Sequence, residues 1–193
     1  MPCPLILGST SIYRRDLLLR LNMPFEVAKP DVDETPLPHE SPAQLAMRLA
    51  LAKARAVASQ HPHACVIGSD QVLDLDGECV GKPLTHANAT LQLQRMRGKS
   101  LVFHTAVAVV HAQRQHEEVR NVITRVQFRM LSDEAIERYL SHEQPYDCAG
   151  SAKSEGLGIS LTQAIQSDDP TALIGLPLIA VCDMLRNTGF DLP

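Results

Sequence analysis

The chain has 193 residues, of which 45% are hydrophobic and 21% charged, values ordinary for a globular protein with a sizeable core. Its 18 basic and 22 acidic residues give a formal net charge of −4, which argues against a nucleic-acid partner. Five cysteines without a C-x-x-C pair, no membrane-length apolar run and no targeting signal predict a single cytoplasmic domain, residues 1–193, with reduced thiols and no membrane partner.

The start of the chain predicts a strand, a helix, a second strand and a long loop. Residues 4–7 are typical of a buried strand, residues 11–22 of a helix, and residues 25–29 alternate as in a strand. The segment "KPDVDETPLPHESP" follows, and its four prolines exclude regular structure. In the predicted helix, three leucines face inward: Leu17, Leu18 and Leu21.

The next helix has a clear start signal. Ser41 is a candidate N-cap, Pro42 stands at the first helical position, and Gln44 completes a capping box. The helix is expected to run to about Gln60. Four residues are expected to form its apolar face: Leu45, Leu49, Ala52 and Ala56.

Strand patterns dominate the middle of the chain. Residues 64–68 predict a buried strand, and Asp76-Gly77 predicts a hairpin turn between two extended runs. Thr85 is expected to cap a helix that ends before Gly98. The runs at 100–112 and 119–130 are then expected to pair as antiparallel strands.

Two more helices complete the predicted order. Ser132 caps one of them, the Gly- and Ser-rich segment "CAGSAKSEGLG" follows as a loop, and the last helix starts near Pro177 and ends by Gly189. Helices between early strands, followed by a long hairpin, predict an α/β protein with a mixed sheet.

The exit of the first strand is a candidate anion site. Ser9 and Ser11 offer hydroxyls beside the free N–H groups of a helix N-terminus. Arg14 and Arg15 stand in or near the first helical turn, where the helix dipole disfavours cations unless a bound anion compensates. The alternative is that Ser11 is only an N-cap and that both arginines are solvated.

Three further groups of residues carry chemistry with alternatives left open. Asp31, Asp33 and Glu34 could hold Mg²⁺, but a solvated acidic loop explains them as well. Asp70 ends a buried apolar strand, where α/β proteins bind ligands, and a functional role is favoured there. The candidate phosphate-binding lysines, each of which could equally be a surface residue, are Lys53 and Lys82.

In this order, the motifs resemble the Maf family of nucleotide pyrophosphatases over nearly the whole chain. They are Ser9-x-Ser11-x-x-Arg14, Asp33-Glu34, Lys53, "GSD" at 68–70, "GKP" at 81–83, "GSAKSEGLG" at 150–158 and "IGLPL" at 174–178. The resemblance implies two lobes around an extended mixed sheet with flanking helices, and an active site in the cleft between them. It also implies a homodimer that hydrolyses the α–β phosphate bond of a nucleoside triphosphate with a divalent cation, Mg²⁺ or Mn²⁺.

The resemblance assigns a role to each candidate. Asp70 would take a proton from the attacking water, and Glu34 with Asp70 would support the metal. The residues expected to bind the triphosphate are Ser9, Ser11, Arg14, Glu34, Lys53 and Lys82.

Three positions are expected to select the base: Tyr13, Gln71 and Glu155. With "SEGLG", they resemble the subgroup that acts on 7-methyl-GTP. Tyr13 could offer a ring face to the cationic base, and Glu155 could accept hydrogen bonds from guanine. The alternatives are a Maf-type enzyme for other nucleotides, such as UTP, TTP or ITP, and a nucleotide sensor that regulates cell division.

Overall fold

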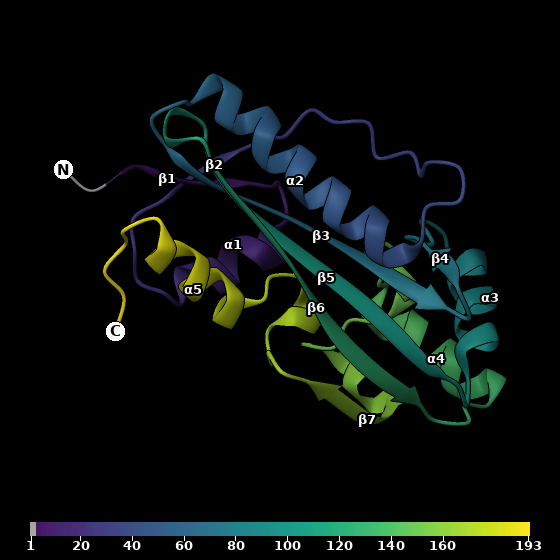
Figure 1. The fold of residues 1–193 in the computed structure, drawn as a ribbon. Helices are drawn as coiled ribbons and strands as arrows, with labels where there is room; N and C mark the ends of the chain where they lie inside the picture. The colour runs from purple at the N-terminus through teal and green to yellow at the C-terminus, as the bar shows by residue number, and fades with distance from the viewer. Residues whose placement is uncertain (1–2) are drawn as a thin grey trace.

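A seven-stranded mixed sheet forms the centre of the computed structural model, which describes residues 3–193 (Figure 1). The strand order is β2-β1-β3-β5-β6-β7, with β4 paired to β3. The strands are β1 (Leu5–Gly8), β2 (Glu26–Ala28), β3 (Cys65–Leu75), β4 (Glu78–Val80), β5 (Ser100–His111), β6 (His116–Phe128) and β7 (Thr162–Ser167). β1 pairs in parallel with β2 and β3, and all other pairs are antiparallel.

Within residues 3–193, five α-helices surround the sheet on its two faces and at one end. They are α1 (Ile12–Leu19), α2 (Pro42–Gln60), α3 (His86–Met96), α4 (Asp133–Glu143) and α5 (Leu178–Asn187). α2 lies along one face, α1 and α5 lie on the other, and α3 and α4 gather at the far end of the long strands (Figure 1). No helix within residues 3–193 is both long and apolar enough to span a bilayer.

The long strands β3, β5 and β6 connect two lobes. In β3, Val66 packs toward α2 and Ile67 packs toward α1 and α5, because successive side chains point to opposite faces. Further along the same strand, Leu73 and Leu75 join the separate core built by α3 and α4. The α/β fold with a mixed sheet and two lobes is therefore confirmed.

Local signals in the sequence predicted most helix starts and one turn. α2 begins with the expected capping box between Ser41 and Gln44, and Thr85 and Ser132 cap α3 and α4. Asp76 and Gly77 both have positive φ, at 57° and 89°, as the hairpin turn between β3 and β4 requires.

Some predicted boundaries were wrong. α1 ends at Leu19 rather than at residue 22, because the chain tightens into i→i+3 bonds and Asn22 turns to a φ of 52°. The predicted strand 64–68 continues without a break to Leu75, since it pairs with β5 along its length. β7 was not predicted, because "TQAIQS" is polar and is an edge strand held only by β6.

The buried face of α2 also differs from the prediction. Ala52 and Ala56 are only half-buried, whereas Ala50, Ala54 and Lys53 are buried. The helix turns this face to β3 because Gly68 permits close contact: a Cβ there would lie 2.3 Å from the carbonyl oxygen of Ala50. This contact brings Lys53 toward the middle of β3.

Candidate active site

A cleft of about 940 Å³ lies where the two lobes meet. Its walls come from the β1–α1 turn, the loop after β2, α2, the middle of β3, the β4–α3 link and two C-terminal loops. All ten predicted site residues line it: Ser9, Ser11, Tyr13, Arg14, Glu34, Lys53, Asp70, Gln71, Lys82 and Glu155. The structure thus brings together residues that are up to 146 positions apart, counting from Ser9 to Glu155.

The exit of β1 places two hydroxyls and one guanidinium in the cleft. Ser11 caps α1, and its Oγ accepts a hydrogen bond from the Arg14 N–H at 3.4 Å. Ser9 is buried, and its Oγ accepts from the Ser11 N–H at 3.2 Å and from Nη1 of Arg14 at 3.5 Å. The capping interpretation of Ser11 is therefore confirmed, and it does not exclude ligand binding, since the cap itself lies at the cleft wall.

Neighbouring Arg14 and Arg15 have different environments. Arg14 is half-buried, and its Nε donates to the carbonyl oxygen of Gly175 at 2.8 Å. Burial lowers the pKa of Arg14, while Asp70 and Glu34 oppose that effect. Arg15 is exposed, pairs with Asp16 at 3.2 Å and does not line the cleft.

The Gly175 carbonyl is an anchor that the sequence analysis missed. It accepts hydrogen bonds from Arg14 and, at 3.0 Å, from the Oγ of buried Ser69. Buried Asp169 holds this loop in place by accepting from the N–H groups of Thr171, at 2.9 Å, and Ile179, at 2.7 Å. "IGLPL" was the only available signal, because the contact joins segments more than 160 positions apart.

At the centre of the cleft, one lysine bridges two carboxylates. Nζ of Lys53 lies 2.6 Å from Oδ1 of Asp70 and 2.7 Å from Oε1 of Glu34. Lys53 and Asp70 are both buried, at 6% and 8% exposure, so the surface-lysine alternative is wrong for Lys53. Glu34 approaches from the proline-rich loop and remains largely exposed.

The two carboxylates have opposite pKa shifts. Burial raises the pKa of Asp70, and this effect outweighs the cations Lys53 and Arg14. Partial burial also acts to raise the pKa of Glu34, but the hydrogen bond and charge of Lys53 lower it overall. An aspartate whose pKa is raised toward neutrality is suited to accept a proton.

Lys82 faces the cluster of Lys53, Asp70 and Glu34 from the opposite lobe. It follows β4, is exposed, lines the cleft and lies close enough to Glu34 to contribute to lowering its pKa. Of the three acidic residues in the proline-rich loop, Glu34 lines the cleft, whereas Asp31 and Asp33 do not. Asp33 accepts from the N–H of Thr35 at 2.9 Å, which is a local turn contact.

A second group of residues lies at the other end of the cleft. Tyr13 is half-buried there, and burial together with Cys148 and Asp147 raises its pKa to about 12. Nζ of Lys153 lies 5.7 Å from the centroid of the Tyr13 ring, so one ring face already holds a cation. Glu155 is exposed at this end.

Gln71 has structural partners that the sequence did not indicate. Its Nε2 lies within 3.1 Å of three oxygen acceptors, on Thr105, Ala172 and Leu173. These bonds hold the short 3₁₀ turn Ala172–Ile174 at the cleft wall. Because the nitrogen is occupied, Oε1 is the amide atom of Gln71 that a ligand can use.

The carboxylates suit a hard cation in part. Asp70 and Glu34 converge on one point, which the ammonium of Lys53 occupies. Within residues 3–193, no group of three or more His, Cys, Asp or Glu side chains could hold a metal ion. This donor set fits Mg²⁺ held by two carboxylates together with substrate phosphates and water, which is its common mode of binding.

The chain is similar to a group of known proteins that share one family and one name. A family model described as "Maf-like protein" matches residues 4–188. A protein of Polaromonas sp. named 7-methyl-GTP pyrophosphatase is 64% identical over 189 residues, covering 98% of this chain and 86% of that protein. Proteins of the same name from Aromatoleum aromaticum and Albidiferax ferrireducens are 62% and 60% identical, over 98% and 96% of this chain and 97% and 93% of theirs.

Proposed function

The chain belongs to the Maf-like protein family, and we propose that it is a nucleotide pyrophosphatase acting on 7-methyl-GTP. Water attacks the α-phosphorus, and the bond to the oxygen that bridges the α- and β-phosphates breaks. The products are 7-methyl-GMP and pyrophosphate.

The charge distribution along the cleft is the observation that carries this proposal. One end is lined by three cationic side chains, Arg14, Lys53 and Lys82, which outnumber the two carboxylates there, those of Glu34 and Asp70. Asp147 and Glu155 line the other end, beside Tyr13, where the ammonium of Lys153 is itself paired with Glu143 at 3.1 Å. 7-Methyl-GTP has a polyanionic triphosphate and a base that methylation makes cationic, so its charges complement both ends.

The phosphate end is preorganised for a triphosphate. Arg14 is fixed by the Gly175 carbonyl, and Ser9 and Ser11 are fixed by the turn into α1. The first residues of α1, Ile12 and Tyr13, line the same cleft, and a helix N-terminus favours an anion. Donors that are already in place need no reorganisation as charge develops on the leaving pyrophosphate.

Asp70 is the general base in this proposal. Its buried position raises its pKa, so that the carboxylate can take a proton from water at neutral pH. Lys53 holds Oδ1 at 2.6 Å and so orients the group. A protein that only sensed nucleotides would have no use for a carboxylate at this point.

A divalent cation, Mg²⁺ or Mn²⁺, belongs to the proposal, with Glu34 and Asp70 as its protein ligands. When bound, it would neutralise phosphate charge in the transition state. Lys53 bridges both carboxylates, so a cation held by Glu34 and Asp70 would compete with its ammonium for their oxygens, and Lys53 would then be free to donate to a phosphate oxygen.

Base selection is assigned to Tyr13, Gln71 and Glu155. The carboxylate of Glu155 can accept hydrogen bonds from the N1–H and exocyclic amine of guanine, a donor pair that pyrimidines lack. The base would stack on the Tyr13 face that is remote from Lys153. Oε1 of Gln71 adds a further acceptor.

Pyrophosphate release from a nucleotide panel tests the proposal. With Mg²⁺ or Mn²⁺, we expect kcat/KM for 7-methyl-GTP to exceed the values for GTP, UTP and TTP by at least about 10-fold, or about 1.4 kcal/mol. Glu155→Gln should reduce this preference and leave the melting temperature unchanged, because Glu155 is exposed. Equal or faster turnover of UTP or TTP would contradict the substrate assignment but not the pyrophosphatase chemistry.

The cellular state of the protein completes the proposal. A cytoplasmic location is supported by its five free cysteines, Cys3, Cys65, Cys79, Cys148 and Cys182. A homodimer is expected from the family resemblance, and light scattering on the purified protein tests it.

A further inference from the structure

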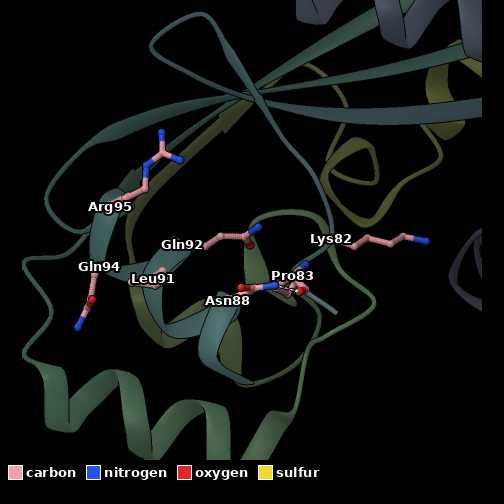
Figure 2. Close-up of a pocket in the computed structure, with 7 residues that line it drawn as sticks. All are labelled: Lys82, Pro83, Asn88, Leu91, Gln92, Gln94 and Arg95. Carbon is pink, nitrogen blue, oxygen red and sulfur yellow. Dashed lines mark hydrogen bonds between the residues drawn. The ribbon is translucent and has the colours of Figure 1, made fainter. Parts of the chain in front are cut away.

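Two amides on α3 hold the segment that carries Lys82. Nδ2 of Asn88 donates to the carbonyl oxygen of Pro83 at 3.0 Å, and Nε2 of Gln92 donates to that of Gly81 at 3.0 Å. The two residues are four positions apart and so share a helix face. In Figure 2 both lie on α3 near Pro83, while the side chain of Lys82 extends away from the helix.

Gln92 makes one contact that Asn88 does not share. Its Oε1 accepts a hydrogen bond from the Oγ of Ser151 at 2.7 Å. Ser151 is fully buried and has a φ of 56°, a left-handed conformation that is uncommon for a residue with a side chain. Such a conformation persists only where its surroundings hold it, and Gln92 is the hydrogen-bond partner of this side chain.

The same two segments also touch through their backbones. The N–H of Gly150 donates to the Gly81 carbonyl at 3.4 Å, and the N–H of Leu84 donates to the Tyr146 carbonyl at 3.1 Å. The chain around Gly81 therefore runs antiparallel to the chain around Gly150. The Gln92 side chain hydrogen-bonds to both of these segments, to Gly81 in one and to Ser151 in the other.

These segments belong to opposite ends of the cleft. Lys82 follows Gly81 and faces the phosphate end, whereas Glu155 lies four residues after Ser151 at the base end. We propose that Gln92 is a positioning residue that couples the triphosphate end of the cleft to the base-selecting loop. This inference rests on the proposed function, in which the two ends bind the two halves of one nucleotide.

Base selectivity measures this coupling better than activity alone. Gln92→Met keeps the length of the side chain and removes both hydrogen bonds. We expect it to reduce the ratio of kcat/KM for 7-methyl-GTP to that for GTP by about 3- to 10-fold, the effect of one lost hydrogen bond. Ser151→Ala should reduce the ratio similarly, and the double variant no further, because both changes break the same contact.

Asn88→Ala is the matched control. It removes the contact to Pro83 but leaves Ser151 untouched, so it should lower kcat/KM for both nucleotides equally and leave their ratio within about 2-fold of the wild type. Gln94→Met, on the same helix, removes only a 3.2 Å bond to Asp133 and should change neither value.

A second measurement does not depend on the substrate. Amide hydrogen exchange over residues 149–156 should quicken in Gln92→Met and in Ser151→Ala, but not in Asn88→Ala. If the wild type shows no preference for 7-methyl-GTP, the substrate assignment fails, and hydrogen exchange alone decides the inference. The inference is overturned if Gln92→Met leaves both the ratio and the exchange unchanged, or if it behaves like Asn88→Ala.

Discussion

At the scale of single residues, the candidate site depends on side chains whose environments differ from those of their chain neighbours. Arg14 reaches the Gly175 carbonyl, whereas Arg15 pairs with Asp16 at the surface. Lys53 is buried between two carboxylates, although its buried neighbours on α2, Ala50 and Ala54, are alanines. The difference between the two arginines is not visible in residue type, so they provide a pair of variants with opposite expectations.

The two arginines form the most direct pair. Arg14→Ala should lower kcat/KM by about 10²- to 10³-fold, the usual effect of removing one preorganised donor to developing charge. Arg15→Ala should change it by less than about 2-fold, because exposed ion pairs contribute little. Steady-state kinetics on 7-methyl-GTP checks both values. Similar losses in the two variants would mean that the triphosphate is placed wrongly.

Asp70 links activity to pH. Asp70→Asn should lower kcat by about 10²- to 10⁴-fold, because a general base is removed. In the wild type, kcat/KM should rise with pH through an apparent pKa above the usual aspartate range, since burial raises the pKa of Asp70. A pH profile that shows no such ionisation, or an Asn variant that turns over normally, would exclude Asp70 as the base.

Stability provides an independent check on the same group. A carboxyl whose pKa is raised by folding contributes its full stability below its unfolded pKa and loses it as pH rises through the folded pKa. Asparagine has no such dependence, so the melting temperature of Asp70→Asn relative to wild type should be higher at pH 8 than at pH 4. In free energy of unfolding, the wild type should lose about 1.4 kcal/mol relative to the variant for each unit by which folding raises the pKa of Asp70. A difference of opposite sign would show that Lys53 dominates over burial.

At the scale of elements, the sequence was informative wherever a local signal suffices. Helix caps at Ser41, Thr85 and Ser132 were predicted because a cap needs only its own side chain and the next turn. The burial of Lys53 could not be predicted, because it depends on Asp70, which lies on another element. β7 was missed for the same reason, since its strand state comes from pairing with β6 and not from its own pattern.

The contact between α2 and β3 gives the element-scale prediction. A Cβ at Gly68 would lie 2.3 Å from the Ala50 carbonyl oxygen and 2.6 Å from the Ala54 nitrogen, so the helix backbone itself must move. Gly68→Ala should therefore cost about 3 kcal/mol of unfolding free energy, as severe overpacking does. It should also lower kcat/KM, because the shift carries Lys53 away from Asp70.

Gly81→Ala is the control for stability. Apart from its own residue and its two chain neighbours, nothing lies within 4 Å of a Cβ at Gly81, and its φ is not in the left-handed region. Urea unfolding of both variants should show a lower free energy of unfolding only for Gly68→Ala. If Gly68→Ala were as stable as Gly81→Ala, the close approach of α2 to β3 would not be what places Lys53.

At the scale of the whole molecule, the cleft forms where two lobes share one sheet. One core is built with α3 and α4, and the others lie at the opposite end of the strands beneath α2 and beneath α1 and α5. β3, β5 and β6 run through both lobes without a break, so each lobe is built on long strands that it shares with the other, besides short strands of its own such as β1 and β4. The family resemblance carried by the seven motifs implied a cleft between two lobes, but the shared strands became apparent only from the pairing of β3 with β5 and of β5 with β6.

The shared strands predict that the 193 residues unfold as one unit. Thermal unfolding followed by calorimetry and circular dichroism should show a single transition, because the loss of either core breaks strands that the other requires. If the proposed function is right, a non-hydrolysable analogue of 7-methyl-GTP would contact both lobes, so at 100 times its Kd it should stabilise the whole protein by about 2.7 kcal/mol. For a chain of this size, that corresponds to a shift of about 5–10 °C in the whole transition. Two transitions, of which the analogue moves only one, would show that the lobes fold separately and that the nucleotide binds within one of them.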